Sequence, residues 1–459
     1  MISLEDTIAA IATPIQPSGI GVIRVSGIDA ISILEPIFKG SEKAFKKSES
    51  HKLQYGWIHD SGELVDQVLM AVMHAPNSYT AENVVEVQCH GSPIVLKKIL
   101  NLIMKNGARI AEAGEFTQRA FLNNRIDLTQ AEAVSDLIHS NSEIGAKLAV
   151  HQLQGKLFNY IEAVKKKVVS IASQIEASIE FPEEVLELNT REGYMHRIDN
   201  VCSDLRKMLS VADQGRRIKM GFLVAIIGRP NVGKSSLFNT LLQEQRVIVT
   251  SIPGTTRDSV EESIQIQGLS FRLTDTAGIR HTGELIEKEG ITRTQLIRSK
   301  ADIVLVILDA SEKLTEGDQT LIGNLDKGKT ILVINKKDLL THEFPDWYES
   351  VSSMKSVLIS AKNGDGCKEL ESYLFEIATQ GIGLPTYEDF YITNLRQQDA
   401  AEKALSALEK AKKILLYPNG EEFLAVDLRS CINALGEIVG ETSSDDLLGQ
   451  IFSEFCIGK

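Results

Sequence analysis

The sequence predicts a multidomain α/β protein in which a parallel-sheet domain is inserted into a helical domain. The chain has 459 residues, which is longer than a domain with a single hydrophobic core usually is. Residues 222–380 alternate apolar strand runs with helical segments, which is typical of a parallel sheet covered on both faces. Apolar residues at helical spacing lie on both sides of that stretch, so we expect the two helical segments to pack together.

The N-terminal region has a different pattern. It mixes short strand-like runs at 21–25 and 84–87 with Gly and Pro turns and one helical stretch after Pro93, which predicts an α+β domain. The expected boundaries are 1–120 for this domain, 121–215 for the first helical part, 216–380 for the inserted domain and 381–459 for the second helical part.

Apolar spacing of three or four residues supports the helical assignment. In the first part it predicts one stripe of a long helix, formed by Leu153, Leu157, Ile161, Val164, Val168, Ile171, Ile175 and Ile179. In the second part the spacing resumes at Ala401, Leu405, Leu408, Ala411 and Leu415, after an expected linker at Gly381, Gly383 and Pro385.

The composition limits the partners and the compartment. The formal net charge of −13 disfavours tight binding to polyanions except through local basic patches. Such patches could lie at 165–167, 216–219 or 410–413, although solvated helix faces are the simpler interpretation. The five cysteines show no C-x-x-C spacing, and neither a signal peptide nor a membrane span is visible, which predicts a cytoplasmic protein.

The inserted domain carries a phosphate-binding motif. Gly228-Arg-Pro-Asn-Val-Gly233-Lys234-Ser235 follows an apolar strand run at 223–227 and precedes a helical run at 236–242. The glycines let backbone N–H groups face phosphates, Lys234 supplies a charge to the β and γ phosphates, and the Ser235 hydroxyl can bind magnesium.

Three further motifs follow in order, each after a strand. Asp275-Thr-Ala-Gly278 offers an acid that can hold magnesium through water and a glycine N–H for the γ phosphate. In Asn335-Lys336-Lys337-Asp338, the carboxylate can accept two hydrogen bonds from guanine, and Ser360-Ala361-Lys362 would complete the base pocket. Each motif alone can be an ordinary turn after a strand, but together they predict a GTP-binding P-loop domain.

The catalytic groups are less obvious. Gly254-Thr255-Thr256-Arg257-Asp258 resembles the first switch of translation-factor-related GTPases, which implies Thr256 as a second magnesium ligand. After Gly278 stands Ile279, where many small GTPases have a glutamine that orients the attacking water. The candidates to take over the role of that glutamine are Arg280, Glu284, Glu287 and Glu289.

Motifs along nearly the whole chain resemble the tRNA modification GTPases of the MnmE/TrmE family. They are Cys456-Ile457-Gly458-Lys459, Asp6-Thr-Ile-Ala-Ala, Gly19-x-Gly21-x-x-Arg24 with Ser26-Gly27, Ala75-Pro-Asn-Ser-Tyr-Thr80, Glu86 with His90-Gly91, and Gly114-Glu-Phe-Thr-x-Arg119-Ala-Phe-Leu-Asn123. If the resemblance is set aside, the residues alone predict a hairpin turn at Gly19-x-Gly21, a strand end at Cys89-His90, and exposed helical charges at Arg119 and Arg125.

The resemblance implies site residues. A 5-formyltetrahydrofolate or related tetrahydrofolate would contact Arg24, Glu86, Arg125 and Lys459, although many relatives have lysine where this chain has Arg125. Glu287 would orient water, with Lys234 and Arg280 as further catalytic candidates, and K⁺ would be bound by Asn231, Thr250, Ile252 and Thr255. Cys456 is either close to the one-carbon chemistry or a small buried apolar residue.

The motifs and the resemblance together predict the residues that contact the nucleotide and its metal ion. Mg²⁺ contacts are expected from Ser235 and Thr256. GTP contacts are expected from Asn231, Val232, Gly233, Lys234, Ser235, Ser236, Thr250, Ser251, Ile252, Pro253, Gly254, Thr255, Thr256, Asp275, Thr276, Ala277, Gly278, Asn335, Lys336, Asp338, Ser360 and Ala361.

The function implied is GTP hydrolysis in tRNA modification. A homodimer, alone or in a heterotetramer with a flavin-dependent partner protein, would install an aminomethyl or carboxymethylaminomethyl group at C5 of the wobble uridine, position 34. The flavin chemistry would come from the partner, because this chain has no G-x-G-x-x-G loop. The alternatives are a ribosome-assembly GTPase, which needs an RNA-binding module that is not visible after residue 380, and a regulatory GTPase without a folate role.

Overall fold

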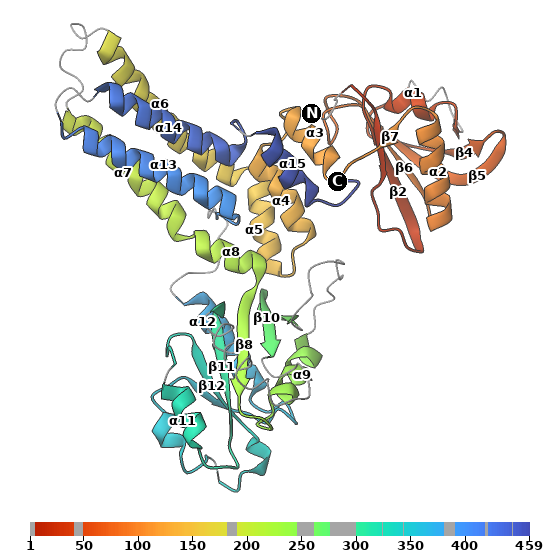
Figure 1. Ribbon diagram of the computed structural model, residues 1–459. Coiled ribbons are helices and arrows are strands. Elements are labelled where there is room, and N and C mark those ends of the chain that lie inside the picture. Colours follow the sequence, from red (N-terminus) through yellow and green to blue (C-terminus); the bar gives the residue numbers. More distant parts are fainter. Residues whose placement is uncertain are drawn as a thin grey trace, which may run out of the picture. The chain divides into compact units, whose positions relative to one another are not determined.

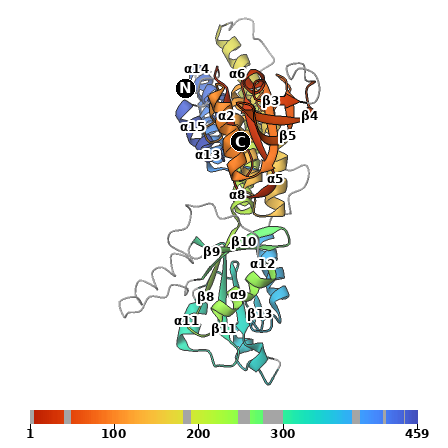
Figure 2. The same ribbon diagram turned by 90° about the vertical axis from the view of Figure 1, so that its right-hand side faces the viewer.

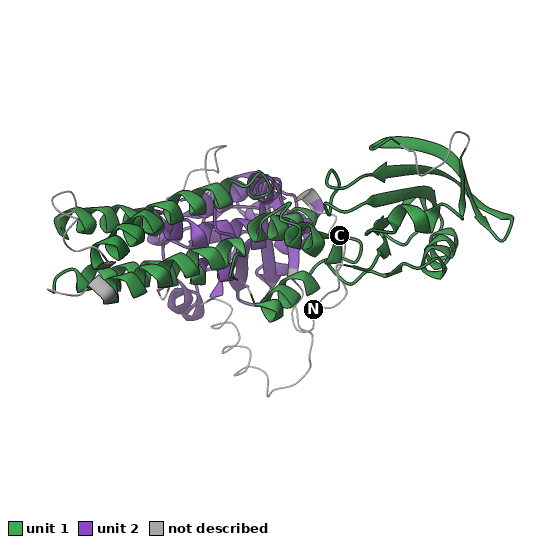
Figure 3. Cartoon of the chain, turned by 90° about the horizontal axis from the view of Figure 1, so that it is seen from above, with its two compact units in different colours: residues 1–138, 152–205, 399–459 green, residues 139–151, 206–398 purple. Residues whose placement is uncertain are grey.

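The computed structural model describes residues 5–40, 49–180, 191–245, 261–275, 300–323, 325–342, 344–380, 391–417, 421–442 and 444–459. The chain forms two compact units (Figure 3). The first comprises residues 1–138, 152–205 and 399–459, and the second comprises residues 139–151 and 206–398. The second unit is therefore inserted into the first, and the chain passes between them at four points because 139–151 also belong to the second unit.

The first unit begins with a seven-stranded sheet in the order β3-β4-β5-β6-β2-β1-β7 (Figure 1). Its strands are β1 Ile8–Ile11, β2 Ser18–Ser26, β3 Phe38–Gly40, β4 Lys52–Asp60, β5 Glu63–Met73, β6 Val84–Gly91 and β7 Arg109–Ile110. Neighbours are antiparallel except β1 and β7, which are parallel. Helices α1 Ala30–Leu34 and α2 Pro93–Lys105 pack their apolar sides on the sheet, where Leu96 and Ile99 join Ile23 and Val87 in the core.

Side chains alternate across β2 and β6 as the pleat of a strand requires. Ile23 and Val87 are buried against the helices. Arg24 and Glu86 are therefore on the other face, and the antiparallel register places them directly opposite each other.

The segment Gly19-x-Gly21 is part of β2, so its interpretation as a hairpin turn is wrong. The register between β2 and β6 shifts between Ser18 and Gly21. A Cβ atom at Gly21 would come within 2.8 Å of Leu96 Cδ2, so the glycine is needed where α2 approaches the strand closely. The expected strand end at Cys89-His90 is observed, since β6 ends at Gly91.

Helices make up the rest of the first unit. They are α3 Glu115–Leu122, α4 Leu128–Ile138, α6 Lys156–Glu180, α7 Arg191–Ser210, α13 Leu395–Ile414, α14 Glu421–Val439 and α15 Asp445–Ser453, of which α7 and α13 each reach a few residues into the second unit. Helix α14 lies along α6 (Figure 1), where Arg429 Nη2 is 2.9 Å from Glu176 Oε1. Lys412 Nζ of α13 is 2.5 Å from Asp199 Oδ1 of α7. The two helical parts of the sequence therefore pack together, as predicted.

The apolar stripe of the first helical part is interrupted. Leu153 ends α5 Glu143–Leu153, and Gly155 with φ +77° separates it from α6, so the single helix expected from 153 to 179 is wrong at its start. The rest of the stripe belongs to α6, and Leu157, Ile161, Val164, Val168, Ile171 and Ile175 are buried. The expected linker at Gly381, Gly383 and Pro385 lies outside the described residues.

The second unit is built on a six-stranded sheet in the order β13-β12-β11-β8-β10-β9. Its strands are β8 Phe222–Gly228, β9 Glu261–Ile266, β10 Leu269–Asp275, β11 Ile303–Asp309, β12 Thr330–Asn335 and β13 Ser356–Leu358. All pairs are parallel except β9 with β10. Its other elements are α5, α8 Ala212–Met220, α9 Lys234–Gln245, α11 Glu316–Gly323, α12 Cys367–Thr379 and the 3₁₀ turns η2 Lys337–Leu339 and η3 Tyr348–Val351.

Helices cover both faces of this sheet (Figure 2). Leu237 of α9 and Leu370 of α12 pack on one face. Leu321 of α11 and Val351 of η3 pack on the other. Because both faces are covered, the central strands are apolar along their whole length, and β11 is buried at all of its positions.

Helix α5 belongs to the core of the second unit although it is distant in sequence. Ile144 and Leu148 are buried with Ile218 and Leu269, and the backbone N–H of Ile144 donates to Gly268 O at 3.0 Å. None of the helices in the described ranges is long and apolar enough to cross a membrane.

Candidate functional sites

The carboxyl edge of the parallel sheet brings the nucleotide motifs together. Strand β8 lies between β10 and β11, so the chain order reverses at the end of β8, and ligands of open α/β sheets bind at such a point. The phosphate motif follows β8, Asp275 ends β10 and Asn335 ends β12.

The phosphate loop from 228 to 235 has the backbone that a loop wrapped around an anion requires. Gly228 and Gly233 have φ +154° and +99°, values that residues with a Cβ rarely adopt. Lys234 is 7% exposed, and its Nζ donates to Gly228 O at 2.8 Å and to Arg229 O at 2.7 Å. The ammonium is thus held within the curve of the loop. Ser235 and Ser236 occupy the first turn of α9, at the positive end of the helix dipole.

Asn335 links the phosphate loop to the base loop, which contains Ser360, Ala361 and Lys362. Its Nδ2 donates to Val232 O at 2.8 Å, and its Oδ1 accepts from the backbone N–H of Ala361 at 2.9 Å. Asn335, Val232 and Ala361 are all buried. The side chain therefore fixes the distance between two loops that are far apart in sequence.

The motif Asn335-Lys336-Lys337-Asp338 carries the acidic group predicted to read guanine. Ser360 Oγ donates to Asp338 Oδ1 at 2.6 Å, and this hydrogen bond lowers the pKa of Asp338. The carboxylate is therefore ionised and acceptor-only at neutral pH. Thr240 Oγ1 of α9 donates to Ala361 O at 2.6 Å. This hydrogen bond joins the helix after the phosphate loop to the base loop, in addition to the bridge through Asn335.

Lys336 adopts a left-handed backbone with φ +69° and pairs with Asp309 at the end of β11, Nζ to Oδ2 at 2.5 Å. Burial raises the pKa of Asp309, but hydrogen bonds from Lys336 and Ser311 outweigh it and lower the pKa overall. Asp309 was not among the predicted site residues, and the only sequence signal for it is an acid at the end of a buried strand.

Arg229 was also missed. Its Nε donates to Asp318 Oδ1 at 2.9 Å, and its Nη2 lies 3.2 Å from Glu312 Oε2. Asp318 is only 4% exposed, so this pair anchors the phosphate loop to α11. The motif allows any residue at the position of Arg229, so its spacing does not point to this side chain.

Asn231 has φ +66° and an exposed side chain in the phosphate loop. The other predicted switch residues lie outside the described ranges: Thr250, Ser251, Ile252, Pro253, Gly254, Thr255, Thr256, Thr276, Ala277, Gly278, Ile279, Arg280, Glu284, Glu287 and Glu289. For Asp275 the structure describes only the backbone.

A second cluster forms on the N-terminal sheet around Arg24 and Glu86. Arg24 Nε donates to Glu86 Oε1 at 2.9 Å, and its Nη2 lies 2.8 Å from the same oxygen. The guanidinium carbon of Arg24 is 5.2 Å from the ring centroid of Tyr79, and that of Arg125 is 5.3 Å from it. Arg125 also donates to Tyr79 O at 2.8 Å. Tyr79, which was not predicted as a site residue, therefore holds both arginines.

The C-terminal tail reaches the same cluster. Gly458 O accepts from Arg24 Nη1 at 3.4 Å, which places the residue next to Lys459 beside the arginine. Gly458 has φ +96°, and a Cβ there would lie 2.7 Å from Ile11 O, so the tail fits closely against the sheet. The Cys456 side chain is exposed, which argues against a small buried apolar residue.

The prediction of an exposed helical Arg119 is wrong, and Arg125 is exposed but lies in a turn after α3. Arg119 is fully buried, and its Nη2 is 2.7 Å from Asp6 Oδ1 and 3.0 Å from Glu115 Oε1. Burial raises the pKa of Glu115, but the hydrogen bonds from Arg109 and Arg119 outweigh it, so the net pKa is lowered and the cluster stays charged. This buried charge network ties the N-terminus to α3.

The phosphate loop and the Asn-Lys-x-Asp motif, joined at the carboxyl edge of one parallel sheet, define the second unit as a guanine-nucleotide-binding P-loop domain. Comparisons with known proteins identify the family. The chain matches the model of the MnmE helical domain over residues 128–456 and that of the N-terminus of the GTP-binding protein TrmE over residues 7–125. The chain therefore belongs to the MnmE/TrmE family, which confirms the resemblance and the fold class predicted from the sequence.

Individual relatives are similar along their whole length. The tRNA modification GTPase MnmE of Carboxydothermus hydrogenoformans is 43% identical over 464 residues, which cover 99% of this chain and 100% of the relative. MnmE of Clostridioides difficile is 41% identical over 458 residues, with the same coverage. Among solved structures, Aquifex aeolicus Era in complex with GDP and aluminium fluoride is 27% identical over 40% of this chain and 66% of that chain. Its TM-score of 0.29 adds nothing to the family assignment.

Proposed function

We propose that this protein hydrolyses GTP as a component of tRNA modification at C5 of the wobble uridine, position 34, where it contributes to an aminomethyl or carboxymethylaminomethyl group. The observation that carries the proposal is the bridge from Asn335 to Val232 and Ala361, which joins a phosphate loop and a base loop into one site. The relatives that match this chain over their whole length are named tRNA modification GTPases, which supports tRNA as the substrate.

The described residues fit a nucleotide with Mg²⁺. Lys234 holds its charge within the loop, and Ser235 presents a hydroxyl at the start of α9, the position from which a P-loop serine binds the metal. When bound, Mg²⁺ neutralises charge on the phosphates. Thr256 would complete its protein ligands, and Glu287 with Arg280 would act on the attacking water and the phosphates.

Potassium is part of the same proposal. Asn231 presents an exposed side chain within the phosphate loop, where its oxygen can help to hold a monovalent cation against the nucleotide. Thr250, Ile252 and Thr255 would supply the other ligands. A cation there would replace the charge that an arginine finger supplies in other GTPases.

The Arg24 cluster suits a tetrahydrofolate. Arg24 bonds Glu86 through Oε1, which leaves Oε2 to accept N–H groups of a pterin ring. Tyr79 offers an aromatic face, while Arg125 and Lys459 offer cations for the carboxylates of a glutamate tail. A tetrahydrofolate bound there would supply the one-carbon unit.

The outer face of the N-terminal sheet supports a homodimer. Leu53, Tyr55 and Trp57 of β4 are 56%, 47% and 37% exposed, and the register places them on the same face as Leu69 of β5. Four large apolar side chains on one sheet face mark a protein interface. The flavin chemistry would come from a partner protein, which the dimer would join in a heterotetramer. All five cysteines are free, which is consistent with the proposed cytoplasmic location.

Two measurements test the proposal. Nucleosides of tRNA from a strain that lacks the protein should show the loss of the modified wobble uridine by mass spectrometry, and the purified protein should release phosphate from GTP and not from ATP. A wobble-uridine profile equal to that of the parent strain would contradict the tRNA assignment. Equal hydrolysis of ATP would contradict the base pocket.

A further inference from the structure

A groove between α6 and α7 gathers hydrogen-bond donors outside the two sites described above. It has a volume of about 620 Å³ and is lined by Lys166, Lys167 and Ser170 of α6 and by Arg197, Asn200 and Ser203 of α7. Both helix segments belong to the first unit. Every one of these six side chains can donate a hydrogen bond, and three of them carry a positive charge.

The charge of this donor groove is positive after its internal ion pair is counted. Asp204 supplies the one carboxylate among the residues that line the described cavity, and its Oδ2 lies 2.7 Å from Lys167 Nζ. Lys166 is exposed and has no ion-pair or hydrogen-bond partner among the residues the structure describes. Two cationic groups therefore remain for a ligand in a chain whose net charge is −13.

Arg197 is held in place before any ligand binds. Its Nη1 donates to Gln174 Oε1 at 2.5 Å and its Nη2 donates to Ser170 Oγ at 3.0 Å. A guanidinium fixed by neutral acceptors keeps its full charge and loses little conformational entropy on binding.

The neighbouring charges of α6 and α7 are used within the fold. Lys165 pairs with Glu441 and lies 3.5 Å from Glu162 Oε1, so it is not free to take a ligand with Lys166. Asp199 pairs with Lys412 and Glu176 pairs with Arg429. The basic run at 165–167 is therefore divided between a structural ion pair and the donor groove.

We propose that the donor groove binds the sugar-phosphate backbone of the tRNA substrate. Phosphate oxygens only accept hydrogen bonds, and most protein contacts that position a nucleic acid are made to them by Arg, Lys, Ser and Asn. The groove offers this set of donors on two helices that pack together. This assignment rests on the proposed function, because the family acts on tRNA.

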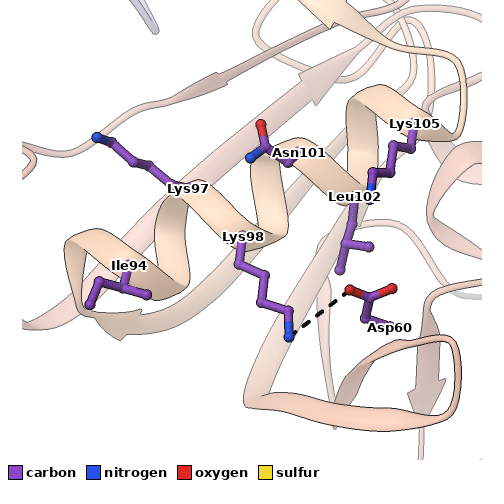
Figure 4. A pocket seen from close by; sticks show the side chains of 7 residues that line it. All are labelled: Asp60, Ile94, Lys97, Lys98, Asn101, Leu102 and Lys105. Atoms are coloured by element: carbon purple, nitrogen blue, oxygen red, sulfur yellow. Dashed lines mark ion pairs between the residues drawn. The ribbon is translucent and has the colours of Figure 1, made fainter.

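A second basic surface serves as a control. Helix α2 carries Lys97, Lys98 and Lys105 around a cavity of about 350 Å³, with Lys98 Nζ 4.0 Å from Asp60 Oδ2. Figure 4 shows Lys97 extending from the helix on the side away from Asp60. These lysines come from a single helix, and the cavity is lined by Asn101 but by no arginine or hydroxyl, so it lacks the guanidinium and serine donors of the groove.

The test compares Lys166→Ala and Lys166→Glu with Lys97→Ala and Lys97→Glu in the full-length protein. Binding of an unmodified tRNA transcript is measured at several salt concentrations. One lost phosphate contact lowers the slope of log Kd against log salt by about 1 and weakens binding about eightfold at 0.1 M salt. We expect this for Lys166→Ala, a larger loss for Lys166→Glu, and less than a twofold change for both Lys97 variants. GTP hydrolysis and thermal unfolding of all four should match the parent, because both lysines are exposed.

Acetylation of lysines, read by mass spectrometry, gives a measurement on the unmutated protein. The tRNA should protect Lys166 and Lys167 but not Lys97, and inorganic phosphate at the same phosphate concentration should protect none of them. Equal losses for the Lys166 and Lys97 variants, or an unchanged Kd for Lys166→Glu, would overturn the assignment while leaving the proposed function intact. Protection by inorganic phosphate alone would show a site for free anions instead. Failure of the parent to bind tRNA would count against both proposals.

Discussion

Replacement of Asn335 by alanine should weaken the second unit and its nucleotide site together. The change removes the donor to Val232 O and the acceptor for the Ala361 N–H, which lie 2.8 and 2.9 Å from the side chain. Both backbone groups belong to buried residues, and a buried group left without a partner costs about 1–3 kcal/mol. The two losses amount to about 2–6 kcal/mol, divided between folding and GTP binding.

Urea denaturation followed by tryptophan fluorescence can isolate this unit. The chain has two tryptophans, and Trp347 belongs to the second unit, where its Nε1 donates to Glu312 O at 2.7 Å. In a Trp57→Phe background Trp347 is the remaining tryptophan, so the fluorescence change measures the unfolding of the second unit. With a denaturant slope of about 2 kcal/mol/M, a loss of about 2 kcal/mol lowers the urea midpoint by about 1 M.

Asn363→Ala is the matched control, because Asn363 is exposed in the loop that carries Ala361 and the same atoms are removed. We expect its midpoint and its affinity for a fluorescent GTP analogue to equal those of the parent. If Asn335→Ala also left both quantities unchanged, the bridge would have no energetic role and the reasoning would be refuted.

Three further outcomes are expected. Asp338→Asn should lower GTP affinity and favour xanthosine triphosphate, because the carboxylate's two acceptors become one acceptor and one donor; competition between the two nucleotides measures this, and undiminished GTP affinity would remove Asp338 from the base pocket. Deletion of Lys459 should weaken calorimetric binding of 5-formyltetrahydrofolate while GTP hydrolysis stays within about twofold of the parent, since one cation contact of roughly 1.5–3 kcal/mol is lost at the Arg24 cluster alone; equal loss of hydrolysis would indicate a structural role. Hydrolysis should be at least about tenfold faster in KCl than in NaCl at matched ionic strength, and Asn231→Ala should abolish the difference, because a bound cation replaces an arginine finger; equal rates in both salts for the parent would exclude the cation.

The parts of the nucleotide site that depend on local spacing could be predicted from the sequence. Gly228, Gly233 and Lys234 stand a few residues apart between a strand and a helix, so their relation is fixed by the backbone of one loop. The bridge from Asn335 to Val232 spans about a hundred residues, and its geometry depends on the order of strands in the sheet, which spacing does not encode.

Burial of charge was the main source of error in the N-terminal domain. Glu115 and Arg119 are four residues apart, which on a helix resembles an ordinary surface ion pair. Asp6 and Glu82 come from distant segments and complete the network that lets Arg119 be fully buried. Tyr79 was missed for the same reason, because its role appears only when Arg24 and Arg125 meet on its ring.

The four crossings of the chain between its two units have a consequence for synthesis on the ribosome. The second unit ends at residue 398, whereas the first needs residues 399–459 to supply α14 and α15. At about 5–20 residues per second, those residues follow after about 3–12 s. During that interval α6 has been made but α14, which packs along it, has not, while every segment of the second unit, including α5, is already present. The GTP-binding unit can thus complete its core first, while α6 lacks its contacts with α14 until the last helices leave the ribosome.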